Sequence, residues 1–240
     1  MKTQKTVIVT GASQGIGACL VKTFLERGYQ VVATARSMEK SGFQASKQLA
    51  LVDGDIGEAS TARKIADAAI EQFGSIDTLV NNAGIYLTKP FTDYTAEDVR
   101  KLVSTNLSGF IYLSQLAVRQ VQEQKKGGSV VSITASLADH PIAGVTASVA
   151  MITKGGIESI SKNLAMEYAK EGIRFNSVAP GVVDTPLHQD DPKDVLRTRS
   201  PMGSIADAQE IVDAVVFLAE AAHITGEVLH VDGGAYVGKW

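Results

Sequence analysis

The stretch Val7-Ile8-Val9-Thr10-Gly11-Ala12-Ser13-Gln14-Gly15-Ile16-Gly17 decides the fold class of this chain. It predicts a buried strand, a tight glycine turn and the first turn of a helix. We expect Gly11 to permit the turn, Gly15 to let the backbone approach a pyrophosphate, and Gly17 to let helix and strand pack closely. A helix N-terminus also offers free N–H groups and a positive dipole end to phosphate. The stretch therefore predicts a nucleotide-binding site.

Composition and charge set the class of protein. Of the 240 residues, 45% are apolar and 20% are charged, which is ordinary for one soluble α/β domain spanning residues 1–240. The net charge of −3 and the lack of a basic cluster argue against a nucleic-acid partner. No apolar run reaches about 18 residues, so no membrane partner is expected. Cys19 is the single cysteine, which fits a reducing cytoplasm.

Short apolar runs alternate with longer helical patterns along the chain. The strands are expected at residues 6–10, 30–35, 49–53, 78–81, 129–133, 174–179 and 227–231. The helices are expected at 15–26, 58–73, 96–122, 149–170 and 206–220. This order predicts a Rossmann-type, doubly wound parallel sheet with right-handed crossovers. The polar segment Asp184–Ser204 holds three of the six prolines and is predicted to be a mobile substrate lid.

Several motifs along the chain resemble those of the short-chain dehydrogenase/reductase family. The resemblance spans essentially the whole sequence and implies a seven-stranded parallel sheet, a nicotinamide cofactor and a homotetramer. The segments that carry it are Thr10–Gly17, Asn81-Asn82-Ala83-Gly84, Thr105–Gly109 with Asn106, Thr153–Gly156 with Lys154, Pro180–Pro186, and Ile224–Gly234.

The resemblance also implies a set of cofactor-binding residues. They are Gly11, Ser13, Gln14, Gly15, Ile16, Gly17, Arg36, Ser37, Asp55, Ile56, Asn81, Ala83, Gly84, Lys154, Pro180, Gly181, Val183 and Thr185. Thr185 would bond the nicotinamide amide. Asp55 has a second interpretation as a turn-capping residue, and Asn81 as a structural strand-end residue.

The end of the second expected strand bears on the choice of cofactor. A site selective for NAD places an acidic side chain there to bind the ribose hydroxyls. This chain has Ala35 at that position, followed by Arg36 and Ser37. The planar guanidinium of Arg36 suits a 2′-phosphate, which an acid would repel. The sequence therefore favours NADP(H) over NAD(H), with a solvated loop charge as the other interpretation of Arg36.

The proton donor of the family is absent from its usual place. Family members carry a Tyr four residues before the Lys, on the same face of a helix. Lys154 is present, but Ala150 stands at the Tyr position and residues 148–153 contain no Tyr. General acid catalysis contributes about 10²–10⁴-fold to the rate, so the loss of the Tyr matters.

The family's Ser corresponds to Ser136, with one residue more than the usual spacing, or else to Ala135. Asn106 is expected to bond a backbone carbonyl in the long central helix and to support a water near Lys154.

Three explanations for Ala150 remain open. The first is that another acid reaches the site, and the candidates are Tyr86, Tyr94, Asp139, His140 and His188. Alternatively, the substrate needs no strong acid, as in reduction of an iminium carbon. Thirdly, the protein binds NADP(H) without turnover, as a sensor or scaffold. An engineered exchange of Tyr for Ala would leave the same sequence.

The leading hypothesis is an NADP(H)-dependent oxidoreductase acting on a carbonyl- or imine-type small molecule, and the alternative is a non-catalytic NADP(H)-binding protein. No metal is expected.

Ala150 is expected to leave open space above the nicotinamide, so that a Tyr would fit there and raise the rate of ketone reduction. A pocket with apolar walls is predicted from Tyr86, Ile142, Leu187, His188 and Leu196. The tetramer is expected to use the small residues Ala147, Ala150, Ala165 and Ala169, and the tail Tyr236–Trp240.

Overall fold

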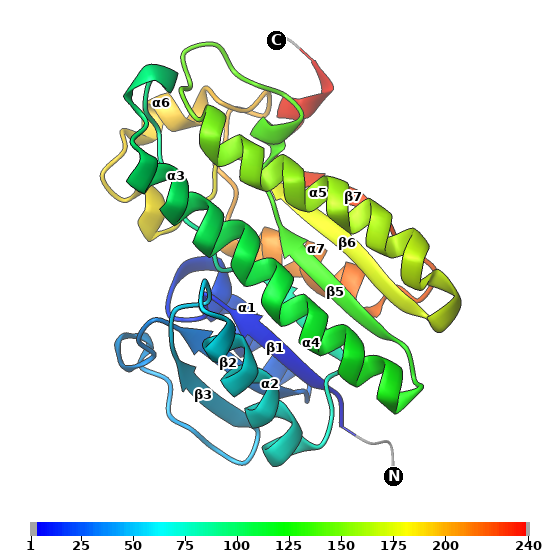
Figure 1. The fold of residues 1–240 in the computed structure, drawn as a ribbon. Helices are drawn as coiled ribbons and strands as arrows, with labels where there is room; N and C mark the ends of the chain where they lie inside the picture. Colours follow the sequence, from blue (N-terminus) through cyan, green and yellow to red (C-terminus); the bar gives the residue numbers. More distant parts are fainter. Residues whose placement is uncertain (1–3, 239–240) are drawn as a thin grey trace.

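A computed structural model describes residues 4–238. Its centre is a seven-stranded parallel sheet in the order β3-β2-β1-β4-β5-β6-β7 (Figure 1). The strands are β1 (Thr6–Thr10), β2 (Gln30–Ala35), β3 (Leu49–Asp53), β4 (Thr78–Asn81), β5 (Gly128–Ile133), β6 (Ile173–Pro180) and β7 (Val228–Val231). The chain winds outward in one direction from β1 to β3 and in the other from β4 to β7. The predicted doubly wound α/β domain is confirmed.

Helices cover both faces of the sheet. On one face lie α1 (Gly15–Glu26) and α7 (Ala208–Glu220), and on the other lie α2 (Ala59–Phe73), α4 (Gly109–Gln124) and α5 (Ser148–Tyr168) (Figure 1). Each face has its own apolar core, the first built around Leu20, Phe24 and Ile211 and the second around Ile65, Leu113 and Phe175. Because both faces are buried, the strands are apolar on both sides rather than alternating.

The helix expected at residues 96–122 is interrupted in the structure. It consists of α3 (Ala96–Leu102), a π-helical stretch η3 (Val103–Ser108) and then α4. A π-helical stretch inserts an extra residue per turn and is frequent at functional sites. Here it contains Asn106, whose side chain is 2% exposed. The interruption thus turns one polar residue toward the interior between α3 and α4.

The segment Asp184–Ser204 contains two short helices, η6 (Pro186–His188) and α6 (Lys193–Arg197). Its start is joined to the main body by a parallel bridge between Val183 and Ala206, and Lys193 forms an ion pair with Asp184. The segment lies at the end of the sheet where α3 and α5 begin (Figure 1). The remaining short helices are η1 (Glu39–Ser41), η2 (Phe91–Asp93), η4 (Ser136–Ala138), η5 (Ala169–Glu171) and η7 (Ala235–Val237).

Three of the four small residues expected at a subunit interface are buried within the chain. Ala147, Ala150 and Ala165 are at most 4% exposed, whereas Ala169 is exposed. The exposed apolar side chains of α5 are Ile152 and Met166, at 63% and 80%. Of the expected tail, residues 239–240 lie outside the described part of the chain. No described helix is both long and apolar enough to cross a membrane.

Candidate active site

A cavity of about 990 Å³ opens at the carboxyl ends of the strands, where the winding reverses between β1 and β4. Ligands of doubly wound folds bind at such a reversal point. All the sequence-predicted cofactor residues line this cavity except Asn81. Of the predicted catalytic residues, Ser136 and Lys154 line it, whereas Asn106 lies behind its wall. The five predicted pocket residues, Tyr86, Ile142, Leu187, His188 and Leu196, also line it.

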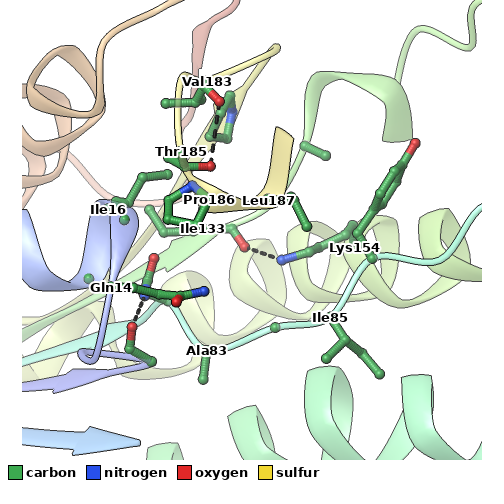
Figure 2. A pocket seen from close by; sticks show the side chains of 18 of the residues that line it. Gln14, Ile16, Ala83, Ile85, Ile133, Lys154, Val183, Thr185, Pro186 and Leu187 are labelled. Atoms are coloured by element: carbon green, nitrogen blue, oxygen red, sulfur yellow. Dashed lines mark hydrogen bonds between the residues drawn. The ribbon is translucent and has the colours of Figure 1, made fainter. Parts of the chain in front are cut away.

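The glycine turn between β1 and α1 forms one wall. Gly11 and Gly15 have positive φ values of 65° and 55°, which side-chain-bearing residues rarely adopt. A Cβ on Gly11 would lie 2.8 Å from the Cα of Ala83, and a Cβ on Gly17 would overlap the carbonyl oxygen of Gly11. Gln14 precedes α1 and makes no side-chain capping bond, so the N-terminus of the helix faces the cavity uncapped (Figure 2). This geometry suits a phosphate.

The loop after β2 brings cations to the far end of the cavity. Arg36, Ser37 and Lys40 line it, and the Arg36 guanidinium makes no ion pair with any residue from 4 to 238. The loop is held in place because Met38 N–H donates to the Asp53 carboxylate at 2.7 Å. Asp55 lines the same end and accepts from Gly57 N–H at 2.9 Å, so it also caps a turn as the second interpretation expected.

Asn81 occupies a structural position at the strand end, its second interpretation, and its neighbour Asn82 lines the cavity. The Asn81 side chain is buried and donates to the Ser114 hydroxyl at 3.1 Å, away from the cavity. Asn82 lines the cavity instead and donates to the carbonyl of Thr10 at 2.8 Å. The Thr10 hydroxyl accepts from the N–H groups of Asn82 and Ala83. Sequence reasoning missed Asn82 and Thr10, although both stand inside the quoted motifs; the period-two alternation of a strand cannot say which of two adjacent Asn residues turns inward.

Asn106 fixes the segment after β4 to helix α5. Its side-chain oxygen accepts from Ile85 N–H at 2.8 Å, and its Nδ2 donates to Ile85 O at 3.0 Å and to the Thr153 hydroxyl at 2.9 Å. The backbone carbonyl that it contacts therefore belongs to the segment after β4 and not to the helix. A Cβ on Gly84 would lie 3.2 Å from the Lys154 Nζ, so a side chain there would crowd the lysine.

Lys154 projects from α5 into the cavity. Its Nζ donates to the Ile133 carbonyl, at the end of β5, at 2.7 Å (Figure 2). Burial lowers the pKa of Lys154 to about 8, and the Glu158 carboxylate one turn later acts in the opposite direction. Glu158 is 3% exposed, and its burial raises the pKa of its carboxyl. The Lys154 ammonium therefore gives up its proton more readily than the ammonium of an exposed lysine.

Ala150 lies beside the cavity rather than open to it. Its side chain is 1% exposed and packs in an apolar cluster with Leu102, Ile85 and Tyr86. The next residue, Met151, lines the cavity. The expectation of open space over Ala150 is thus wrong in this structure, because neighbouring side chains fill it. Ala135 and Ser136 both line the cavity, so the structure leaves open which of them corresponds to the family's Ser.

The five candidate acids fall into two groups. Tyr94 donates to the Leu87 carbonyl at 2.6 Å, Asp139 lies 3.6 Å from His230 Nε2, and His140 packs edge-on against Tyr236. None of these three lines the cavity. Tyr86 and His188 do line it. The Tyr86 hydroxyl forms no hydrogen bond with the described residues, and burial raises its pKa, whereas His188 Nδ1 is bound to the Asp191 carboxylate at 2.7 Å.

The loop after β6 closes the remaining side. Pro180, Gly181, Val183 and Thr185 line the cavity, and a Cβ on Gly15 would meet the Thr185 side chain at 3.4 Å. The Thr185 hydroxyl has only a long contact of 3.5 Å to the Val183 carbonyl (Figure 2). It is therefore available to a ligand lying between the glycine turn and this loop.

The fold and this cavity define a nucleotide-binding α/β protein, and comparison with known proteins places it more closely. Residues 11–236 match the family described as Enoyl-(Acyl carrier protein) reductase. The chain belongs to the short-chain dehydrogenase/reductase family, whose members are NAD(P)-binding oxidoreductases.

Two relatives and one solved structure illustrate the range of this similarity. The 3-oxoacyl-[acyl-carrier-protein] reductase of Escherichia coli is 35% identical, covering 97% of this chain and 98% of the relative. The L-rhamnose 1-dehydrogenase (NAD(P)(+)) of Azotobacter vinelandii is 34% identical, covering 97% of both chains. The structure of ElxO with NADP bound is 27% identical, with a TM-score of 0.90, covering 98% of this chain and 100% of that one.

Proposed function

We propose that this protein is an NADP(H)-dependent oxidoreductase that reduces a carbonyl or imine group of a small molecule. The observation that carries the proposal is a single cavity with two chemically different ends. One end combines the uncapped N-terminus of α1 with the cations of Arg36 and Lys40, and the other combines Lys154 with apolar walls. A phosphate-rich cofactor suits the first end, and a small organic substrate suits the second.

The residues present fit a nicotinamide dinucleotide. Gly11 and Gly17 leave no room for side chains at the turn, so the backbone N–H groups of residues 13–17 stay accessible to a pyrophosphate. Arg36, with Ser37, would hold the 2′-phosphate that distinguishes NADP(H), since β2 ends in Ala35 and not in an acid. Lys154 and Thr185 would hold the nicotinamide half. The cofactor supplies the hydride when it is bound.

Tyr86 is our candidate for the proton donor. Ala150 has no group that can transfer a proton, whereas Tyr86, which packs against the apolar cluster containing Ala150, lines the cavity. Arg199 lowers the pKa of that phenol against the larger effect of burial, which raises it. A phenol that remains protonated near neutral pH can donate to a forming alkoxide. His188, oriented by Asp191, is the second candidate, and an iminium substrate would need neither.

Three further predictions go with this function. We propose that residues 1–240 act as one cofactor-binding domain in which residues 184–204 close over the substrate. A homotetramer is proposed from the family resemblance, with the exposed Ile152 and Met166 of α5 available for contacts between subunits. We further propose that the protein works in the cytoplasm without nucleic-acid or membrane partners.

The test is to mix the protein with NADPH and a panel of ketones, imines and quinones, and to follow nicotinamide absorbance. NADPH binding, measured by titration, is expected to be accompanied by oxidation with at least one class of compound. Binding without turnover across the whole panel would instead favour the non-catalytic alternative, a sensor or scaffold. Failure to bind NADPH would reject both.

A further inference from the structure

Arg199 stands out among the charged residues of the segment Asp184–Ser204. Lys193 pairs with Asp184, Arg197 pairs with Asp194, and His188 pairs with Asp191. Arg199 makes no ion pair with any of the described residues, yet it lines the cavity and is partly buried. Its guanidinium is therefore free to bind an anion that enters the cavity.

The backbone around Arg199 is held in place rather than loose. Arg199 N–H donates to the Leu196 carbonyl at 3.0 Å. The next residue, Ser200, donates its hydroxyl to the Gly233 carbonyl at 3.4 Å and accepts from Met202 N–H at 3.2 Å. These bonds hold the backbone from which the Arg199 side chain reaches the cavity.

The proposed cofactor leaves this cation without a partner. Of the residues that line the cavity, Arg36, Lys40, Lys154 and Arg199 have a basic side chain, and Asp55 is the one carboxylate. Arg36 and Lys40 lie at the 2′-phosphate end, and Lys154 is committed to the nicotinamide half. Arg199 lies near Tyr86, whose pKa it lowers while burial raises it more strongly and Asp191 also raises it. Arg199 thus belongs to the substrate end.

The cavity that Arg199 lines also has apolar side chains on its walls. They include Ile142, Val145, Met151, Leu187 and Leu196. A substrate that fills this space has a hydrocarbon part as well as an anionic group. An arginine binds a carboxylate through two parallel N–H···O bonds, which fixes direction as well as position.

We propose that the substrate is a carbonyl compound that bears a carboxylate and an apolar chain, and that Arg199 binds the carboxylate. The proposal rests on the proposed function, because it assigns the substrate end of that same cavity. The carboxylate at Arg199 and the carbonyl at Tyr86 then lie close together, so the two groups are expected to be separated by few bonds.

The experiment titrates hexanoate and hexanamide separately into the protein by calorimetry, with and without saturating NADP⁺. The two probes have the same length and differ in charge. Arg199→Gln is the test variant, and Arg197→Gln is the matched control, since Arg197 lies in the same segment, is paired with Asp194 and does not line the cavity. NADP⁺ binding is measured first for each variant.

Hexanoate is expected to bind the parent at least tenfold more tightly than hexanamide, a preference that Arg199→Gln removes and Arg197→Gln keeps. Equal binding of the two probes, no measurable binding of hexanoate, or an equal loss in both variants would overturn the proposal. NADP⁺ binding distinguishes a failure of the proposed function from a failure of the assignment of Arg199. Absence of NADP⁺ binding rejects the proposed function, whereas normal NADP⁺ binding without a preference for hexanoate rejects only the assignment of Arg199.

Discussion

Replacing Arg36 by Ala should weaken the binding of NADPH much more than the binding of NADH. NADPH carries a 2′-phosphate that NADH lacks, and Arg36 is the permanent cation directly after β2 at that end of the cavity. A hydrogen bond to a charged group contributes about 1.5–3 kcal/mol. Arg36 is exposed and without an ion pair, so water competes for it and the lower end of that range applies. Since about 1.4 kcal/mol corresponds to tenfold, NADPH should bind roughly tenfold more weakly.

The assay is a fluorescence titration of NADPH and of NADH against the parent and Arg36→Ala. The dissociation constant of NADH should stay within twofold of the parent value. Arg63→Ala is the matched control, because Arg63 is an exposed arginine on α2 that does not line the cavity. Equal weakening of both cofactors would refute the reasoning, since it would mean that Arg36 does not distinguish the 2′-phosphate.

Two further predictions concern α5. The pKa of Lys154 falls from its ordinary value of 10.5 to about 8, so between these values the unfolded chain binds more protons and stability should rise with pH. From pH 7 to pH 10, the free energy of unfolding measured with urea should therefore rise more for the parent than for Lys154→Met. Parallel pH profiles of the two proteins would contradict the lowered pKa. Ala150→Tyr should destabilise the protein by about 1–3 kcal/mol, because the site is 1% exposed and already filled. Lys162→Tyr, on the exposed side of the same helix, should have little effect in the same unfolding assay, and an unchanged Ala150→Tyr midpoint would show that the space is open after all.

The fold was predictable because its signals are local. Strands that are buried on both faces appear in the sequence as apolar runs, and the glycine turn marks the first β–α connection. The strand bounds expected from the sequence therefore agree with the observed bounds to within one residue. The interruption at Val103–Ser108 was not predicted, because the segment has no Pro or Gly that would mark a break in the helical pattern. Only the packing of Asn106 between Ile85 and Thr153 fixes it.

The site was predictable in its backbone-driven parts and less so where side-chain direction matters. Glycines at the turn and Lys154 follow from motif spacing. Ala150 shows the limit, because its small size suggested a vacancy, while the tertiary packing of Tyr86 and Leu102 fills it. Arg199 has no motif around it, and only the three-dimensional arrangement separates it from the paired charges on the same segment.

The most direct test of the account compares NADPH oxidation by the parent, Tyr86→Phe and His188→Gln, using a ketone and an iminium compound from the panel. Tyr86→Phe is expected to lower the rate of ketone reduction by about 10²–10⁴-fold, with NADPH binding and iminium reduction unchanged. His188→Gln should leave ketone reduction within a few-fold of the parent. Undiminished ketone reduction by Tyr86→Phe would contradict the assignment, and a large loss confined to His188→Gln would move the proton donor to the His188–Asp191 pair.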